Sequence, residues 1–441
     1  MVSQKAITRK FSPLILCIAL VVILGSLLLV GGLLAPIRVI GGSMAETFYG
    51  PHYKICCHDC RYCFSIDALA IPPPQSIHCP NCGHRSTREV EQPIHPGDQL
   101  LVNKVSYHFR DPKRWEPVLF RSTQPSVEYC LKRVVGLPKE NVVISQGDLW
   151  VNGQRLKKDW PTLMSMALVV HDSRFASTSP RAVQRWRSLK AESGWERVGN
   201  GYRCSPDAQT SPRQQFDIIG YQHLDFRRGD PQATDKITDD YAYNQTLSRR
   251  LYPTDDLVLS AKIQCQGSGS LSFQLGNCRL QLDCDQQLGA LFYAGRQIAS
   301  FPWDVRQLQQ PTQLEVATVD RQFFLVIDNK VCFSRDLEAG SEASPSAVAD
   351  RTAEWPEHVP RLAIGSKGLA IRVADLRVLR DVYYTREITG VIESRTEECS
   401  LGEDEFFVLG DNSPVSLDSR RDAAAALVRR QDLCGRVWRW R

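Results

Sequence analysis

Residues 129–138 read YCLKRVVGLP, an apolar run with two adjacent cations in its middle. Its aromatic and β-branched residues, closed by a glycine and a proline, predict a β-strand. Because successive side chains of a strand point to opposite faces, Lys132 and Arg133 are expected on different faces. A lysine on a buried face loses hydration, which lowers its pKa and lets the neutral amine act as a general base. A Lys-Arg pair without further support is ordinarily solvated surface.

Similar short runs lie on both sides of this strand. They are QLLVNKVSYHF, NVVIS and DLWVNG within residues 94–160, and FFVLG within residues 385–441. A second β-rich region fills residues 194–384, where many short strands separated by turns favour a β-sandwich. The chain is therefore predicted to be mainly β, with an antiparallel β core interrupted by insertions.

The composition of the 441 residues sets the class of protein. A hydrophobic share of 43%, a charged share of 23% and a mean hydropathy of −0.27 exclude a polytopic membrane protein and a wholly disordered chain. The net charge is +5, from 54 basic and 49 acidic residues. This excess is too small to predict nucleic-acid binding.

One stretch is long and apolar enough in sequence to predict a transmembrane helix. Residues 13–34 carry no charge and would span about 33 Å as a helix, against a hydrocarbon core of about 30 Å. Lys5, Arg9 and Lys10 precede it, which predicts a cytoplasmic N-terminus and an extracytoplasmic remainder in the cell (inner) membrane. A cleaved signal peptide is the alternative, but the apolar run is longer than usual and lacks a convincing A-x-A site.

Two polar segments suggest a catalytic site. Ser43 follows the apolar stretch within GGSMAE, and residues 410–420 read GDNSPVSLDSR. A serine in such a loop is usually a turn residue, and it becomes a nucleophile only when a base takes its proton. In the second segment, Asp418 and Arg420 could form an ion pair that fixes the loop.

These segments resemble the ordered boxes of bacterial type I signal peptidases, the Ser-Lys leader peptidases. Four boxes occur in family order behind the apolar stretch, and the resemblance extends over residues 37–50, 94–160 and 385–441, about a third of the chain. The boxes are residues 41–47 (GGSMAET), 96–104 (PGDQLLVNK), 129–138 (YCLKRVVGLP) and 406–420 (FFVLGDNSPVSLDSR). The sequence departs from the family pattern at Glu46, which replaces a proline, at Lys139-Glu140, which replaces Gly-Asp, and at Ser413, which replaces an arginine.

The resemblance implies a role for each matched residue. Ser43 would be the acylated nucleophile, Lys132 the general base that then protonates the leaving amine, and Ser416 the hydroxyl that orients the lysine. The backbone N–H of Ser43 would help to form an oxyanion hole. The supporting residues would be Asp418, Arg420, Met44 and Arg133. Catalysis would need no cofactor.

The implied activity is removal of N-terminal signal peptides from exported preproteins through an acyl-enzyme. Expected partners are preprotein signal peptides, membrane lipid and a secretion translocon. Two alternatives are a non-catalytic envelope adhesin or scaffold on the same frame, and a self-cleaving Ser-Lys repressor relative. Retention of all three catalytic residues argues against the first, and the apolar stretch without a DNA-binding region argues against the second.

Six cysteines crowd residues 51–92. The spacing Cys57-x2-Cys60 followed by Cys79-x2-Cys82 fits the zinc-ribbon pattern, in which four thiolates hold a structural zinc ion. Cys63 could replace Cys57 in a second register, but the preferred ligands are Cys57, Cys60, Cys79 and Cys82. A disulfide-linked segment is the alternative, because an extracytoplasmic location is oxidising.

The predicted organisation has eight parts. They are a cytoplasmic tail (1–12), the transmembrane anchor (13–34), three parts of the catalytic core (35–50, 93–160 and 385–441), the zinc-ribbon-like insertion (51–92), a connector (161–193) and a β-sandwich insertion of concanavalin A or laminin-G type (194–384).

Overall fold

The computed structural model describes most of the chain. The described residues are 13–70, 76–86, 93–122, 127–177, 179, 182–205, 215–225, 232–234, 236–338, 355–356, 358–386, 398–421 and 426–439. The expected cytoplasmic tail, residues 1–12, lies outside them.

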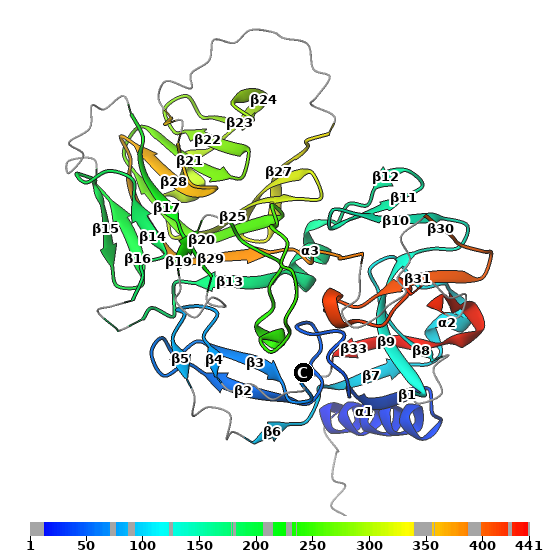
Figure 1. The fold of residues 1–441 in the computed structure, drawn as a ribbon. Helices are drawn as coiled ribbons and strands as arrows, with labels where there is room; N and C mark the ends of the chain where they lie inside the picture. The colour runs from blue at the N-terminus through cyan, green and yellow to red at the C-terminus, as the bar shows by residue number, and fades with distance from the viewer. Residues whose placement is uncertain are drawn as a thin grey trace, which may run out of the picture.

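The core that carries the four boxes is built on a seven-stranded antiparallel sheet from three distant parts of the chain (Figure 1). Its strand order is β1 (Leu34–Arg38), β7 (Gln99–Asn103), β33 (Leu433–Arg439), β8 (Pro117–Arg121), β9 (Tyr129–Gly136), β31 (Glu405–Leu409) and β32 (Val428–Arg429). The strand predicted around Lys132 is β9, and it lies between β8 and β31. Both faces of its second half are buried, which suits a run of apolar residues.

A four-stranded sheet packs against this one. Its order is β12 (Gln154–Arg155), β11 (Asp148–Val151), β10 (Asn141–Ser145) and β30 (Cys399–Ser400). Alternate residues of β10 are buried, as a half-covered strand requires. Val142, Leu149 and Phe407 share one apolar cluster, so the two sheets have a common core.

The apolar N-terminal stretch forms helix α1 (Pro13–Val30), which is shorter than residues 13–34. It ends early because Leu34–Arg38 pair with β7 as strand β1. The described apolar side chains of α1, such as Leu16 and Val21, are exposed. No helix in the described part of the chain has both the length and the apolar character needed to cross a membrane, so the predicted transmembrane helix is not supported.

Two larger sheets pack face to face as a β-sandwich (Figure 1). The first comprises β15 (Trp195–Val198), β16 (Gly201–Cys204), β29 (Ala370–Arg380), β20 (Leu257–Gln266), β25 (Thr312–Val319), β26 (Gln322–Ile327) and β27 (Lys330–Asp336), with β13 (Leu168–Asp172) also on β29. The second comprises β14 (Trp186–Ser188), β17 (Asp217–Tyr221), β28 (Leu362–Lys367), β21 (Ser270–Leu275), β22 (Cys278–Asp283), β23 (Leu288–Tyr293) and β24 (Arg296–Pro302). Strands β13 and β14 come from the segment predicted as a connector, where short polar interruptions hide the strand pattern.

The cysteine-rich segment forms two small sheets. They comprise β3 (Cys63–Asp67), β2 (His52–Cys56) and β6 (Ile94–His95), and separately β4 (Ile77–His78) and β5 (Arg85–Ser86). β6 brings the chain back beside β2, so the segment leaves and re-enters the core at neighbouring points.

The remaining elements are short. They are α2 (Ser106–Phe109), α3 (Trp160–Met166), β18 (His223–Asp225), β19 (Gln232–Thr234) and the 3-10 turns η4 (Ala242–Asn244), η5 (Val305–Leu308), η7 (Ser413–Val415) and η9 (Arg430–Asp432). Asp159 caps α3 by accepting a hydrogen bond from the N–H of Thr162 at 3.0 Å. The neighbouring Lys158 ammonium forms buried ion pairs with Asp320 and Asp381, which fasten the start of the helix to the sandwich.

Candidate active site

The loop that carries Ser43 is held at its base by the Pro-Gly-Asp segment. The Asp98 carboxylate accepts a hydrogen bond from the N–H of Tyr49 at 3.0 Å, and the N–H of Asp98 donates to the Tyr49 carbonyl at 2.8 Å. The N–H of Val39 donates to the Asp98 carbonyl at 3.0 Å. Gly97 is required here because a Cβ atom would collide with the Val39 carbonyl. Ser43 therefore lies in a loop with fixed ends, and it is half-buried.

Ser43 and Ser416 meet at Gly410. A Cβ atom on Gly410 would collide with both the carbonyl oxygen of Ser43 and the Oγ atom of Ser416. The Ser416 Oγ atom is fully buried and has no hydrogen-bond partner among the described residues. A buried hydroxyl without a partner is unusual, so this oxygen is free to bond a nearby donor.

Lys132 lies on the strand that neighbours this glycine. In the β9–β31 pair, Val134 lies opposite Val408 and Arg133 opposite Leu409. Lys132 and Gly410 are the chain neighbours of this last pair. The Lys132 side chain is only 4% exposed. Burial therefore lowers its pKa below the usual 10.5, against the opposing effect of the nearby Asp418 carboxylate.

The predicted ion pair between Asp418 and Arg420 lies under this site. The Arg420 guanidinium donates to the Asp418 carboxylate at 2.8 Å through both Nε and Nη2, and both side chains are buried. It also donates to the carbonyls of Ser413 and Ser416, at 2.7 and 3.1 Å. Although burial opposes it, Arg420 lowers the pKa of Asp418, which keeps the carboxylate charged. The pair thus fixes the loop that carries Ser416.

Arg133 has a separate role in the structure. Its guanidinium forms a bidentate pair with the Asp411 carboxylate and donates to the Trp115 carbonyl at 2.7 Å. Lys132 and Arg133 are both buried, so neither belongs to the solvated surface that a Lys-Arg pair usually forms.

Met44 is buried at 1% exposure in an apolar cluster with Val39, Phe48 and Leu100. It contributes apolar packing directly behind Ser43. Met44 therefore joins the loop that carries Ser43 to an apolar cluster of the core.

Sequence reasoning missed two asparagines in this region. Asn412 donates from its N–H to the Ser43 carbonyl at 3.0 Å and from its side chain to the Gly42 carbonyl at 2.9 Å. Asn244 exchanges two hydrogen bonds with the Asn412 side chain. The GDN motif contained a signal for Asn412, but no local pattern links it to Asn244, which lies 168 residues away.

The four preferred cysteines form one cluster. Sγ atoms of Cys57, Cys60, Cys79 and Cys82 all lie within 4.8 Å of one another. The Cys57–Cys82 and Cys60–Cys79 Sγ separations are 3.6 and 3.5 Å. Four thiolates at about 2.3 Å from a tetrahedral zinc ion would be about 3.8 Å apart, so the cluster fits this metal.

The alternative register is excluded, because Cys63 forms a disulfide with Cys56. The segment therefore combines both of the chemistries considered from the sequence: one disulfide and, beside it, a separate cluster of four thiols.

The family match of this chain includes two of the four boxes, residues 96–104 and 129–138. Residues 83–190 match the family described as signal peptidase, peptidase S26. A probable signal peptidase I-2 of Synechocystis sp. is 36% identical over 76 residues, which are 16% of this chain and 35% of the relative. Signal peptidase I of Leptolyngbya laminosa is 40% identical over 70 residues, 14% of this chain and 34% of the relative. The chain thus spans about a third of the length of the curated relatives it matches.

Solved structures give only weak likenesses. The carbohydrate binding module CBM66 from Bacillus subtilis shares 10% identity at a TM-score of 0.23, over 45% of this chain and 93% of the other. The exoplasmic/lumenal domain of VIP36 shares 8% identity at a TM-score of 0.27, over 50% of this chain and 90% of the other. Scores this low support no conclusion about this chain.

Proposed function

Because the chain belongs to the signal peptidase S26 family, we propose that it is a membrane-associated serine endopeptidase that removes signal peptides by a Ser-Lys mechanism. The observation that carries this proposal is the close approach of the Ser43 carbonyl and the buried Ser416 hydroxyl at Gly410, next to the strand that carries the buried Lys132. Among the described residues, this hydroxyl has no hydrogen-bond partner.

In the proposed reaction, the Ser43 Oγ atom attacks the scissile carbonyl carbon while the neutral Lys132 amine takes its proton. The lysine then gives this proton to the leaving amine, and the peptide bond breaks to leave a Ser43 ester. Water, deprotonated by the same lysine, hydrolyses the ester and regenerates the serine. Ser416 orients the lysine amine, and the backbone N–H of Ser43 helps to stabilise the oxyanion.

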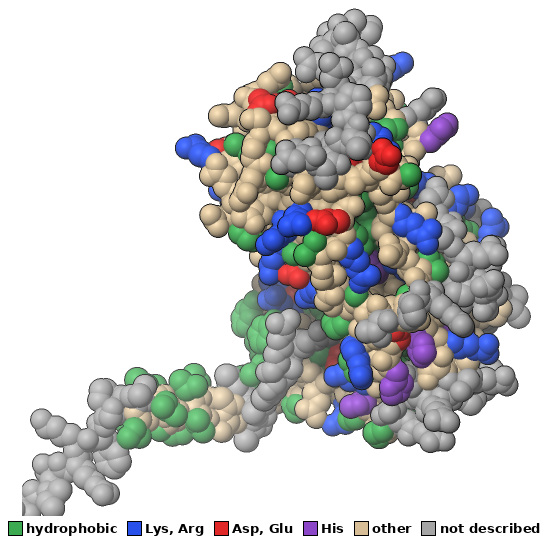
Figure 2. Space-filling model, turned by 90° about the vertical axis from the view of Figure 1, so that its left-hand side faces the viewer, with side chains coloured by type: hydrophobic (Ala, Val, Ile, Leu, Met, Phe, Trp, Pro, Cys, Tyr) green, Lys and Arg blue, Asp and Glu red, His purple; other side chains and the backbone are tan. Residues whose placement is uncertain are grey.

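The partners in this proposal are preprotein signal peptides, membrane lipid and a secretion translocon. The exposed apolar side chains of α1, which projects from the body of the molecule in Figure 2, support a location at the cell membrane. We propose that residues 13–34 anchor the chain, with a cytoplasmic N-terminus and an extracytoplasmic catalytic region.

A structural zinc ion in the cysteine cluster belongs to the same proposal. Cys57, Cys60, Cys79 and Cys82 would hold it, and the ion would stabilise a segment that has only a small apolar core. It supplies no catalytic chemistry.

The test is cleavage of a purified preprotein by the full chain. We expect the wild type to release the mature protein and Ser43→Ala and Lys132→Met to be inactive. Ser165→Ala is the matched control, because Ser165 is exposed and its hydroxyl donates to the carbonyl of Thr162 within the same short helix. Cleavage by Ser43→Ala at the wild-type rate would contradict the mechanism. Preprotein binding without any cleavage by the wild type would favour the adhesin or scaffold alternative.

A further inference from the structure

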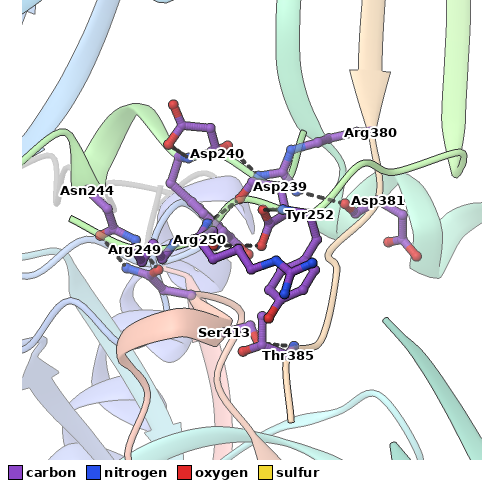
Figure 3. A network of polar contacts seen from close by, with 12 residues as sticks. Asp239, Asp240, Asn244, Arg249, Arg250, Tyr252, Arg380, Asp381, Thr385 and Ser413 are labelled. Carbon is purple, nitrogen blue, oxygen red and sulfur yellow. Dashed lines mark hydrogen bonds and ion pairs between the residues drawn. The ribbon is translucent and has the colours of Figure 1, made fainter. Parts of the chain in front are cut away.

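A loop of the sandwich region reaches the candidate active site. This loop, residues 239–252, is named the insertion loop, and it contains η4. Asp239 closes its base: the carboxylate accepts hydrogen bonds from Arg249 Nη1 and from the N–H of Tyr252, both at 2.7 Å (Figure 3). The buried Arg380 guanidinium donates to the neighbouring Asp240 carbonyl at 2.5 Å. The loop therefore has a defined shape that is fixed from the sandwich side.

The tip of the insertion loop makes a paired contact with the GDN segment. Asn244 Nδ2 donates to Asn412 Oδ1 at 2.6 Å, and Asn412 Nδ2 donates to Asn244 Oδ1 at 3.0 Å. Asn244 is 5% exposed and Asn412 is fully buried. Two reciprocal hydrogen bonds between buried amides fix the plane of the Asn412 side chain.

The orientation of Asn412 bears directly on the nucleophile loop. Its Nδ2 atom donates a second hydrogen bond to the Gly42 carbonyl at 2.9 Å, and its N–H donates to the Ser43 carbonyl at 3.0 Å. These two carbonyls flank the Cα atom of Ser43. Because the Gly42 and Ser43 carbonyls are both held, the backbone conformation of Ser43 is fixed, and so is the direction in which its side chain points.

Three more contacts bind the insertion loop to the same place. The Tyr243 ring packs so closely on Gly42 that a Cβ atom there would lie 2.6 Å from the ring. The Tyr241 hydroxyl donates to the Asp411 carbonyl at 2.9 Å. Glu46, where the family pattern has a proline, lies beside the insertion loop: burial raises the pKa of its carboxyl, and the main-chain N–H groups of Tyr243 and Ala242 act in the opposite direction. The sequence thus departs from the family pattern at a residue that lies beside the insertion loop.

We propose that Asn244 is a positioning residue for the reaction, supplied by the sandwich insertion and acting through Asn412 on Ser43. This inference rests on the proposed function. It gives the sandwich a role in the peptidase itself, since the core alone would leave the Asn412 amide without its buried partner.

The test measures steady-state preprotein cleavage by the full chain. We expect Asn244→Ala to lower kcat by about 100-fold, because small misplacements of a reacting group have effects of this size, while KM stays within twofold. If Asn244 acts through Asn412, the double variant Asn244→Ala/Asn412→Ala should be no slower than Asn412→Ala alone. Asn244→Asp, which keeps the size and the acceptor oxygen, should lose less activity than Asn244→Ala.

Gln245→Ala is the matched control. Gln245 belongs to the same loop and exchanges two hydrogen bonds with the main chain of His78, away from Ser43. It should keep the wild-type kcat. The inference is overturned if Asn244→Ala keeps the wild-type kcat, if Gln245→Ala falls equally, or if the effects of Asn244→Ala and Asn412→Ala multiply. Should Asn244→Ala fail to fold, a wild-type kcat in Asn412→Ala overturns the inference instead, because Asn244 is proposed to act through Asn412. An inactive wild type would count against the proposed function alone.

Discussion

The Arg133 guanidinium and the Asp411 carboxylate form a bidentate pair, with Nε–Oδ1 and Nη2–Oδ2 separations of 2.8 and 2.6 Å. The pair joins β9 to the segment that follows β31. Arg133 directly follows Lys132 in the chain, and Asp411 directly follows Gly410. Both side chains are 4% exposed or less. A buried charge that loses its partner is strongly destabilising, so this pair holds the two strands of the site in register.

Replacing Arg133 with methionine should therefore destabilise the core. We expect Arg133→Met to reduce the free energy of unfolding by about 3–5 kcal/mol, since Asp411 would be left buried and unpaired. The measurement is urea unfolding of the full chain. Lys139→Met is the control, because the Lys139–Glu403 pair is exposed on both sides and should contribute less than about 1 kcal/mol. Equal losses of unfolding free energy in Arg133→Met and Lys139→Met would contradict the stabilising role of the Arg133–Asp411 pair.

Lys132→Met should abolish cleavage and yet stabilise the protein. Burial lowers the pKa of Lys132 in the folded state, while the unfolded chain keeps a value near 10.5. Between these two pKa values the unfolded state binds more protons, so stability rises with pH. Below both pKa values the amine is charged in the folded and in the unfolded state, so the folded state bears the full free-energy cost of burying this charge. Methionine removes that cost. Thermal unfolding at pH 7 should show a higher midpoint for Lys132→Met than for the wild type; a lower midpoint would count against a destabilising lysine.

The pH dependence of cleavage should report the same amine. In the proposed mechanism only neutral Lys132 accepts the Ser43 proton, so kcat/KM is expected to be lost as pH falls through the lowered lysine pKa. The Asp418 carboxylate favours the charged amine. Asp418→Asn should therefore move the acid limb of the profile to lower pH, whatever its effect on the maximum rate. A shift to higher pH would show that another group controls this limb.

The cysteine cluster should bind one zinc ion per chain. We expect Cys60→Ser to lose the metal, because only three thiolates remain. Cys63→Ser should retain it, since Cys63 lies in the disulfide with Cys56. Elemental analysis of the purified variants distinguishes the two. Loss of zinc from Cys63→Ser would restore the alternative register, in which Cys63 replaces Cys57 as the fourth ligand.

Much of the core could be predicted because its signals are local. The alternation in NVVIS became β10, and the spacing of Cys57, Cys60, Cys79 and Cys82 anticipated their cluster. Gly410 and Gly97 occupy positions where the chain approaches itself too closely for a side chain, which is why the motifs around them contain glycine.

The rest depends on contacts between distant parts of the chain. Nothing near Asn244 shows that its amide will face Asn412 across 168 residues. The apolar stretch predicted one helix over residues 13–34, but the helix ends at Val30, Gly32 follows in a turn at a φ of 68°, and Leu34 pairs with Asn103 of β7. Strands β13 and β14 are too short to give a clear period, and the sandwich sheets determine their conformation.

The junction between the core and the sandwich should be sensitive to pH through Asp256. Oxygens of Asp148, Asp256 and Asp320 lie within 4.8 Å of one another, and Lys158 pairs with Asp320 and Asp381. Burial, reinforced by the Asp320 and Asp381 carboxylates, raises the pKa of Asp256 to about 7. Between the unfolded value of 3.8 and this pKa, the folded state binds more protons than the unfolded state, so stability falls as pH rises.

Asp256→Asn removes this titration. We expect the variant to exceed the wild type in free energy of unfolding by on the order of 2 kcal/mol at pH 8, and by much less at pH 4, where Asp256 is protonated in the folded wild type. Asp255→Asn is the neighbouring control, because Asp255 is exposed and its pairing with Arg361 should contribute little at either pH. Urea unfolding at the two pH values measures both variants. If Asp256→Asn raised the free energy of unfolding as much at pH 4 as at pH 8, Asp256 would be charged in the folded protein at both pH values. Its neighbours would then not raise its pKa.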